Sequence, residues 1–357
     1  MGPRTEASIL CLGDFETAAQ DALSHAVYEF VAAGAGDEIT LADNKAAFDR
    51  IKLRPRVLRD VSTIDTQIEL FGVKLPHPLL LAPTGLQRLS HPEGEVATAS
   101  GAGKAGAIFV LSTNATATIE ECVAASNLPI WFQLYWQSDR EFNRDLVTRV
   151  EAGGAKALMI TVDSPTLGER YRPQRAGFNI PADLVTPYFH DRNSGLPSRG
   201  SRQDGRPAWR ESLSWREIEW LRSLTKMPLI LKGILDPADA EQAVEIGANG
   251  LVVSNHGARN LDTLPATIDA LPAIAERVSG RATIILDGGI RRGTDVLKSR
   301  ALGATAVMIG RPYVFALAAA GAAGVTRCVN LLRDELETAM ALTGRRVVAE
   351  IDRSVIW

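Results

Sequence analysis

The chain has 357 residues, of which 46% are hydrophobic and 23% charged, and its formal net charge is −3. This composition is typical of a soluble globular protein, and the mixed charges argue against the basic surface that nucleic-acid binding needs. Three widely separated cysteines, Cys11, Cys122 and Cys328, form no CxxC pair. We therefore expect neither a disulfide framework nor a metal site, and the cysteine content favours a reducing compartment.

Targeting signals are not evident. No apolar run approaches the roughly 18–20 residues that a membrane-spanning helix needs. The N-terminal stretch MGPRTEASILCLGDFE is too weakly basic and too briefly apolar for a signal peptide. We expect a cytoplasmic protein with no membrane and no nucleic-acid partner.

The first 76 residues are predicted to form a helical cap. The stretch DFETAAQDALSHAVYEFVAAGAG (14–36) starts with an aspartate and stops at glycine, as a helix would. Residues 77–357 contain short, nearly continuous apolar runs at 78–83, 107–112, 130–136, 157–163, 228–233, 250–255, 283–289 and 306–312. Such runs are typical of parallel strands buried on both faces.

Amphipathic helical stretches, such as 236–248 and 293–304, lie between these runs. Eight strand–helix units predict an α/β protein with a (β/α)8 TIM barrel, and a doubly wound open sheet is the alternative. The connection after the fourth strand, from Asp163 to a helix that begins near Ser214, is long and rich in Pro, Gly and Ser. Since it follows the C-terminal end of a strand, we expect it to overhang the barrel mouth.

Active sites of such barrels lie at the C-terminal ends of the strands. Polar or charged residues follow nearly every predicted strand: Thr84 with Gly85, Ser112, Gln133 with Tyr135, Thr161 with Asp163 and Arg170, Lys232, then Ser254 with His256 and Arg259. Any one of them could be an ordinary loop residue. The whole set predicts a site.

The last two predicted strands lead into DGGIRRG (287–293) and GRP (310–312). A phosphate site after strands seven and eight recurs in this fold. Glycines let backbone N–H groups approach an anion, and Arg291 and Arg311 can pair with phosphate oxygens. The alternative is that these glycines only make tight turns.

The stretch VVSNHGARNLD (252–262) runs from a buried strand into His256. Histidine suits proton abstraction near neutral pH, and Asp163 could hold the imidazolium as it forms. Arg170 and Arg259 form the pair of cations that a carboxylate substrate would need. A lone histidine is more often structural, but the two arginines and the aspartate nearby favour a catalytic role for His256.

The motifs HPEGE, FQLYW, TVDSPTLGERYR, LKGI, SNHGARNLD and LDGGIRRGTDVLKSRALGATAVMIGRP together resemble the FMN-dependent 2-hydroxy-acid oxidase and dehydrogenase family. This family includes glycolate oxidase, lactate oxidase, mandelate dehydrogenase and hydroxymandelate oxidase, and the similarity covers nearly the whole chain. The resemblance implies that FMN oxidises an L-2-hydroxy acid to the 2-oxo acid. Oxygen or another electron acceptor would reoxidise the flavin, in a homotetramer or homo-octamer.

The resemblance also implies a role for each matching residue. The catalytic group would be His256, Asp163, Tyr135 and Lys232, with Lys232 at flavin N1 unless it only forms a salt bridge. The substrate would meet Arg170, Arg259, Tyr135, Phe30 and Asn114. The flavin would be held by Pro83, Thr84, Gly85, Ser112, Gln133, Thr161, Lys232 and Ser254, and its ribityl phosphate by Asp287, Gly289, Arg291, Gly310 and Arg311.

Three positions, Phe30, Asn114 and Asn260, depart from the family pattern, and a fourth, Gly85, has the glycine of mandelate dehydrogenase and lactate monooxygenase. Phe30 stands where a tyrosine is common, and Asn114 where glycolate oxidase has a tryptophan. These two changes favour an aromatic or longer-chain substrate. Gly85 replaces the alanine of many oxidases, which tilts the expectation away from a fast peroxide-producing oxidase. Asn260 replaces the usual glutamine, a change expected to be minor.

Two other functions stay open from the sequence. One is a flavin-binding protein that has lost catalysis, which the change at Phe30 keeps in view. The other is a different FMN barrel enzyme, such as an isopentenyl diphosphate isomerase, against which the set His256, Arg259 and Arg170 argues.

Overall fold

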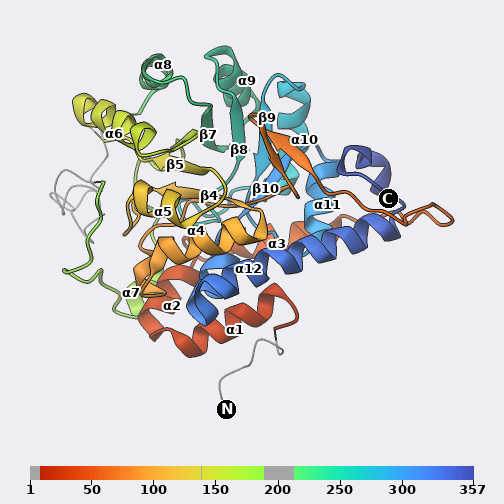
Figure 1. Ribbon diagram of the computed structural model, residues 1–357, viewed down its shortest axis with the longest axis horizontal. Helices are drawn as coiled ribbons and strands as arrows, with labels where there is room; N and C mark the ends of the chain where they lie inside the picture. The colour runs from red at the N-terminus through yellow and green to blue at the C-terminus, as the bar shows by residue number, and fades with distance from the viewer. Residues whose placement is uncertain (1–8, 138, 189–212) are drawn as a thin grey trace.

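The computed structural model describes residues 9–137, 139–188 and 213–357 of the chain (Figure 1). Eight parallel strands close into a barrel in the order β10-β3-β4-β5-β6-β7-β8-β9. They are β3 (Leu79–Leu81), β4 (Ile108–Ser112), β5 (Ile130–Leu134), β6 (Leu158–Thr161), β7 (Leu229–Ile234), β8 (Gly250–Val253), β9 (Thr283–Leu286) and β10 (Ala306–Ile309). The predicted (β/α)8 barrel is confirmed, and the open-sheet alternative is wrong.

The strands are apolar on both faces because each face packs against a different core. Each strand contributes at least one residue to the barrel interior, including Leu80, Val110, Trp131, Met159, Ile230, Val252, Ile285 and Met308. The alternate residues, such as Phe109, Leu231 and Leu286, pack outward against the helices. This double burial explains the continuous apolar runs, since alternation with polar residues is seen only where one sheet face meets water.

Eight helices surround the barrel, one after each strand. They are α4 (Gly94–Ala105), α5 (Ile119–Ala125), α6 (Arg140–Ala152), α8 (Trp215–Leu224), α9 (Pro237–Glu245), α10 (Thr267–Val278), α11 (Gly293–Ala301) and α12 (Arg311–Leu342). The described part of the chain also has short helical turns: η2 (Gln87–Leu89), α7 (Tyr171–Arg175), η3 (Val348–Glu350) and η4 (Arg353–Val355). The predicted helices at 236–248 and 293–304 correspond to α9 and α11.

Helix α12 is long and apolar enough to cross a membrane by length and composition alone. It bends at Ala320 and Gly321, where the backbone leaves helical geometry, and more than half of its most apolar stretch is buried against the protein. It packs on α1, α4 and α11 (Figure 1). Burial in the core therefore accounts for its apolar composition.

The N-terminal region differs from the predicted helical cap in two ways. The single helix expected at 14–36 is two helices, α1 (Leu12–Ala22) and α2 (His25–Ala32), because Leu23 is extended and Ser24 starts α2 as its N-cap. Helix α3 (Ile39–Arg50) follows. The region then ends in an antiparallel hairpin of β1 (Ile68–Leu70) and β2 (Val73–Leu75), which the sequence reading missed.

The hairpin closes the N-terminal end of the barrel. Leu70 and Leu75 join the interior core, and the ring of Phe71 lies 5.6 Å from that of Trp131, near the start of β5. Ligands must therefore enter from the opposite, C-terminal end. The long connection between β6 and α8 follows that end, but residues 189–212 lie outside the described residues, and its overhang stays a prediction.

Candidate active site

The loop after β8 places His256 by an uncommon backbone turn. His256, Gly257 and Ala258 all have left-handed φ angles, of 58°, 61° and 61°, a region that residues other than glycine seldom adopt. Asn255 stabilises the turn, because both its carbonyl and its side-chain oxygen accept a hydrogen bond from the Ala258 N–H, at 2.9 and 3.1 Å. The side chains of Asn255 and Asn44, from α3, exchange two further hydrogen bonds of 2.8 and 3.0 Å.

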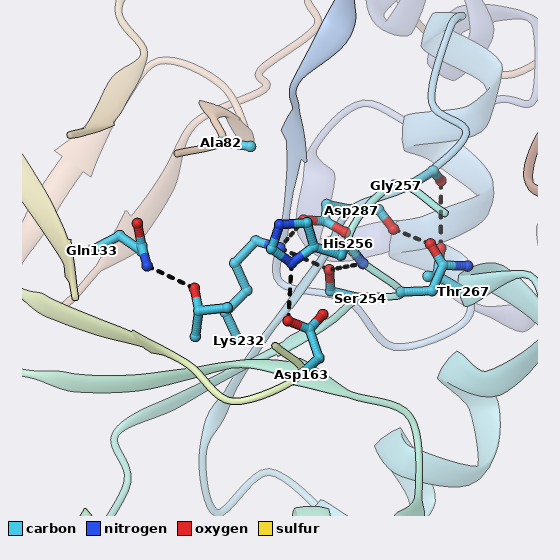
Figure 2. A network of polar contacts seen from close by, with 12 residues as sticks. Ala82, Gln133, Asp163, Lys232, Ser254, His256, Gly257, Thr267 and Asp287 are labelled. Atoms are coloured by element: carbon cyan, nitrogen blue, oxygen red, sulfur yellow. Dashed lines mark hydrogen bonds and ion pairs between the residues drawn. The ribbon is translucent and has the colours of Figure 1, made fainter. Parts of the chain in front are cut away.

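The His256 imidazole lies between two polar groups from neighbouring strand ends, and Figure 2 shows its contact with one of them, Asp163. Its Nδ1 lies 2.9 Å from Asp163 Oδ1, and its Nε2 lies 3.2 Å from the Tyr135 hydroxyl. Burial alone would raise the pKa of Asp163, but the nearby charges of His256 and Lys232 and its hydrogen bonds lower it below the usual value. An ionised Asp163 only accepts, so it keeps the imidazole proton on Nδ1 and leaves the Nε2 lone pair free to act as a base.

Lys232, Ser254 and Asp287 form a buried polar group beside His256 (Figure 2). The Lys232 ammonium lies 2.9 Å from Asp287 Oδ2 and donates to Ser254 Oγ at 2.8 Å. Burial would lower the pKa of Lys232, but the Asp287 and Asp163 carboxylates outweigh it and raise that pKa above its usual value. The salt bridge considered from the sequence is present, and it keeps a charged ammonium inside the site.

Side chains at the ends of β4, β5 and β6 form one hydrogen-bonded row. Ser112 donates to Gln133 Oε1 and Gln133 donates to Thr161 Oγ1, both at 2.9 Å. Thr84, after Pro83 and the end of β3, hydrogen-bonds the buried Tyr313 hydroxyl. Tyr313 was not predicted from the sequence, because it lies within the apolar start of α12 and looks like a core residue.

Four arginines lie at this end of the barrel: Arg170, Arg259, Arg291 and Arg311. Among the described residues, no carboxylate lies within ion-pair distance of their guanidinium groups. Burial lowers the pKa of each below the usual value, and for Arg259 the charges of Arg170 and Arg311 add to the effect. Uncompensated buried cations favour anionic ligands, as predicted for a phosphate and a carboxylate.

Arg259 and Arg311 share acceptors at the C-terminal end of α2. The Val31 and Ala33 carbonyls accept hydrogen bonds from both guanidinium groups, at 2.8–3.2 Å. Arg311 also donates to the Gly257 carbonyl at 2.8 Å, so three of its five N–H donors are already used. One N–H on each terminal nitrogen is left for a phosphate.

Close packing requires glycine at only one of the two positions assigned to the phosphate. A Cβ on Gly289 would lie 1.9 Å from the Asn44 carbonyl oxygen, so the close approach of α3 requires glycine there. A Cβ on Gly310 would meet nothing nearer than Thr84 Cγ2 at 3.8 Å. That is an ordinary van der Waals contact, so packing does not require glycine at position 310.

Phe30 lies between the two predicted substrate cations. Its ring stacks on Phe178 at 4.2 Å, and the guanidinium carbons of Arg170 and Arg259 lie 5.7 and 5.5 Å from its centre. Phe178 was missed because it belongs to the long loop, where the sequence has no periodic pattern. Asn114 lies over Gly85, where a Cβ would be 2.4 Å from Asn114 Cβ.

These residues fit a ligand with an anionic phosphate and several hydroxyl groups, as FMN has. The Oδ1 atoms of Asp287 and Asn114 are buried without a hydrogen-bond partner among the described residues, and buried acceptors of this kind normally have one. Arg291 and Arg311 supply positive charge, and Lys232 supplies a cation that is already paired. The donor set and the free acceptors thus both agree with the predicted cofactor.

The chain is similar to well-described proteins over nearly its whole length. Residues 19–357 match the family model of FMN-dependent dehydrogenases. Glycolate oxidase of Spinacia oleracea is 44% identical over 97% of this chain and 95% of its own, and L-lactate oxidase of a Nostoc species is 47% identical over 97% of each. A crystal structure of mandelate oxidase with benzoyl-formic acid superimposes with a TM-score of 0.88, at 41% identity over 96% of this chain and 97% of that one.

The buried Lys232–Asp287 pair gives a stability prediction. Asp287→Asn would leave the ammonium without its counter-charge, so we expect the unfolding free energy to fall by about 3–5 kcal/mol. Replacing both partners, with Lys232→Met added, should recover much of that loss. Urea unfolding with and without added FMN measures both effects.

The control is Asp43→Asn, which breaks the exposed pair between Asp43 and Arg50 and should change stability little. An Asp287→Asn protein as stable as this control would contradict the assignment of a charged, buried pair.

Proposed function

The chain belongs to the FMN-dependent dehydrogenase family, and we propose that it oxidises an L-2-hydroxy acid to the corresponding 2-oxo acid. The observation that carries the proposal is the position of the His256–Asp163 pair beside two guanidinium groups that have no carboxylate within ion-pair distance in the described part of the chain. Tyr135 connects them, since its hydroxyl meets His256 Nε2 and it interacts electrostatically with Arg170 and Arg259. A base next to a carboxylate site suits a substrate whose reacting carbon bears both a hydroxyl and a carboxylate.

Each of the site residues would have its own role in the reaction. Arg170 and Arg259 hold the carboxylate, and Tyr135 orients the substrate. His256 accepts through Nε2 a proton that the substrate loses, and the Asp163 carboxylate stabilises the imidazolium that results. Bound FMN supplies the acceptor for the two electrons, and the Lys232 ammonium supplies positive charge for the reduced state.

Anaerobic mixing with a panel of L- and D-2-hydroxy acids tests the function. We expect L-2-hydroxy acids to bleach the yellow flavin absorbance and to leave one equivalent of 2-oxo acid. A protein that binds FMN but is bleached by none of the panel would instead be a flavin-binding protein without this activity.

The predicted base gives the first kinetic prediction. His256→Asn should leave FMN bound, because none of the predicted flavin contacts is removed. Flavin reduction should slow by about 10²–10⁴-fold, the range for loss of a general base. Stopped-flow absorbance under nitrogen measures the rate, and near-normal reduction by the variant would show that His256 is not the base.

The substrate side chain is proposed to be aromatic or longer than that of glycolate or lactate. Phe30 offers an apolar ring beside both guanidinium groups, and its ring is held in place by Phe178. A phenylalanine donates no hydrogen bond to a carboxylate, a contact worth roughly 1.5–3 kcal/mol. Small acids lose that contact without compensation, whereas larger ones gain about 25 cal/mol per Å² of apolar surface buried on the ring.

We expect kcat/KM to be higher for aromatic or longer-chain L-2-hydroxy acids than for glycolate. Phe30→Tyr should improve the small acids more than the large ones, because the added hydroxyl serves the carboxylate that all of them share. Steady-state kinetics of both proteins on one panel decides the matter. Glycolate as the best substrate, or a variant with no shift toward small acids, would refute the pocket argument.

Oxygen is the proposed electron acceptor, which revises the expectation drawn from Gly85. Glycine at this position has a packing reason, because an alanine methyl would collide with Asn114. Its presence therefore says little about oxygen access. The similar proteins from Spinacia oleracea and Nostoc are both named oxidases, which supports oxygen as the acceptor.

We expect the reduced protein to reoxidise rapidly in oxygenated buffer with one equivalent of hydrogen peroxide per flavin. Stopped-flow absorbance and a peroxidase-coupled assay give the rate and the stoichiometry. Slow reoxidation by oxygen combined with fast reoxidation by a quinone would identify the protein as a dehydrogenase instead.

A further inference from the structure

Asn260 and Ser164 form a polar layer behind the His256–Asp163 pair. Asn260 follows β8, four residues after His256, and Ser164 follows Asp163 directly after β6. The Asn260 side-chain amide donates two hydrogen bonds of 2.8 Å, to the Asp163 backbone carbonyl and to Ser164 Oγ. Ser164 Oγ in turn donates to Asp163 Oδ1 at 3.1 Å and lies 3.4 Å from His256 Nδ1.

We propose that Asn260 and Ser164 are positioning residues that fix the Asp163 carboxylate against His256, an inference that rests on the proposed function of His256 as the base. A serine hydroxyl has one proton and accepts at its lone pairs. Since the Asn260 amide donates to that oxygen, the hydroxyl proton points to Asp163 Oδ1. Oδ1 thus accepts from both Ser164 and the imidazole, and this sets the orientation of the carboxylate.

The surroundings of Asp163 make this layer necessary. Its other oxygen, Oδ2, is buried without a hydrogen-bond partner among the described residues, so no second contact holds the carboxylate plane. Gly233 approaches so closely that a Cβ there would lie 2.5 Å from Asp163 Cβ and Cγ and 2.8 Å from Oδ2. The carboxylate is confined by the Gly233 backbone and oriented through Ser164.

Asn260 also connects the loops that carry the two substrate cations. A Cβ on Gly168, two residues before Arg170, would lie 2.2 Å from the Asn260 carbonyl oxygen and 2.4 Å from that of Arg259. The loop after β6 therefore packs directly on the loop after β8. The Asn260 side chain makes hydrogen bonds to both residue 163 and residue 164.

The test compares Ser164→Ala and Asn260→Ala with the wild type, each loaded with FMN. The limiting rate of anaerobic flavin reduction should fall about 10- to 100-fold, the effect of losing a hydrogen bond to a charged group. Binding of the 2-oxo acid product, followed by its perturbation of the flavin spectrum, should change less than threefold, because Arg170 and Arg259 are retained. Ser164→Thr keeps the hydroxyl and should restore most of the rate.

The double variant should be slower than Ser164→Ala by less than the factor that Asn260→Ala costs alone, since one of the two Asn260 hydrogen bonds acts through Ser164 and the effects are then not additive. Asn249→Ala is the matched control. Asn249 precedes β8 at the opposite end of the barrel, where its side chain accepts from the Leu229 N–H at 2.9 Å and from Arg222 at 3.0 Å. This variant should lose stability but keep the rate of flavin reduction.

A second measurement does not depend on turnover. In the proton spectrum of the 15N-histidine-labelled protein, the hydrogen bond to Asp163 should shift the His256 Nδ1 proton downfield, and His256→Asn identifies the signal. Ser164→Ala and Asn260→Ala should move this signal upfield or broaden it through exchange with water, whereas Asn249→Ala should not.

The proposal is overturned if the signal and the reduction rate of Ser164→Ala match those of Asn249→Ala, or if Ser164→Thr fails to restore them. A wild-type protein that no 2-hydroxy acid reduces would refute the proposed function. The histidine signal would still decide the positioning role in that case.

Discussion

The reciprocal hydrogen bonds between Asn44 and Asn255 are the contact on which the arrangement of the site depends. Both side chains are 2% exposed, and neither amide could be left unpaired at that burial without a large cost. Asn255 holds the left-handed turn at residues 256–258, and this turn aims His256 at Asp163 and exposes the Gly257 carbonyl to Arg311. Asn44 ties the same turn to α3. This buried pair of side-chain amides thus links the N-terminal region to the turn that positions both the base and one arginine of the predicted phosphate site.

Electrostatics imposes a second constraint, because the mouth of the barrel concentrates positive charge. Arg259 and Arg311 are stabilised in part by the last carbonyls of α2, which carry the negative end of the helix dipole. Carbonyl dipoles neutralise a guanidinium less completely than a carboxylate does, so each cation keeps affinity for an anion. The site is organised in advance for a phosphate and a carboxylate, whose charges complete it.

The sequence was sufficient to predict features that follow from the repeated strand–helix pattern and from the chemistry of single residue types. The eight apolar runs predicted the barrel because burial on both strand faces removes polar residues, and the strand exits predicted which side chains meet at the mouth. It was insufficient where a contact depends on tertiary distance. Nothing local marks Asn44 as the partner of Asn255, or the close approach of α3 that requires glycine at position 289. Leu23 interrupts a pattern that otherwise continues as a helix, and Tyr313 is indistinguishable from core.

The boundary at residue 76 marks where the strand–helix repeat begins, and contacts that form the site cross it. Residues before it supply Asn44 to the base turn, Phe30 to the substrate side, carbonyls of α2 to two arginines, and Leu70 and Leu75 to the barrel interior. A barrel without them would expose interior side chains at one end, and at the other it would remove the Val31 and Ala33 carbonyls that accept from Arg259 and Arg311. Because both changes would leave buried groups without their contacts, the N-terminal region and the barrel together form the site.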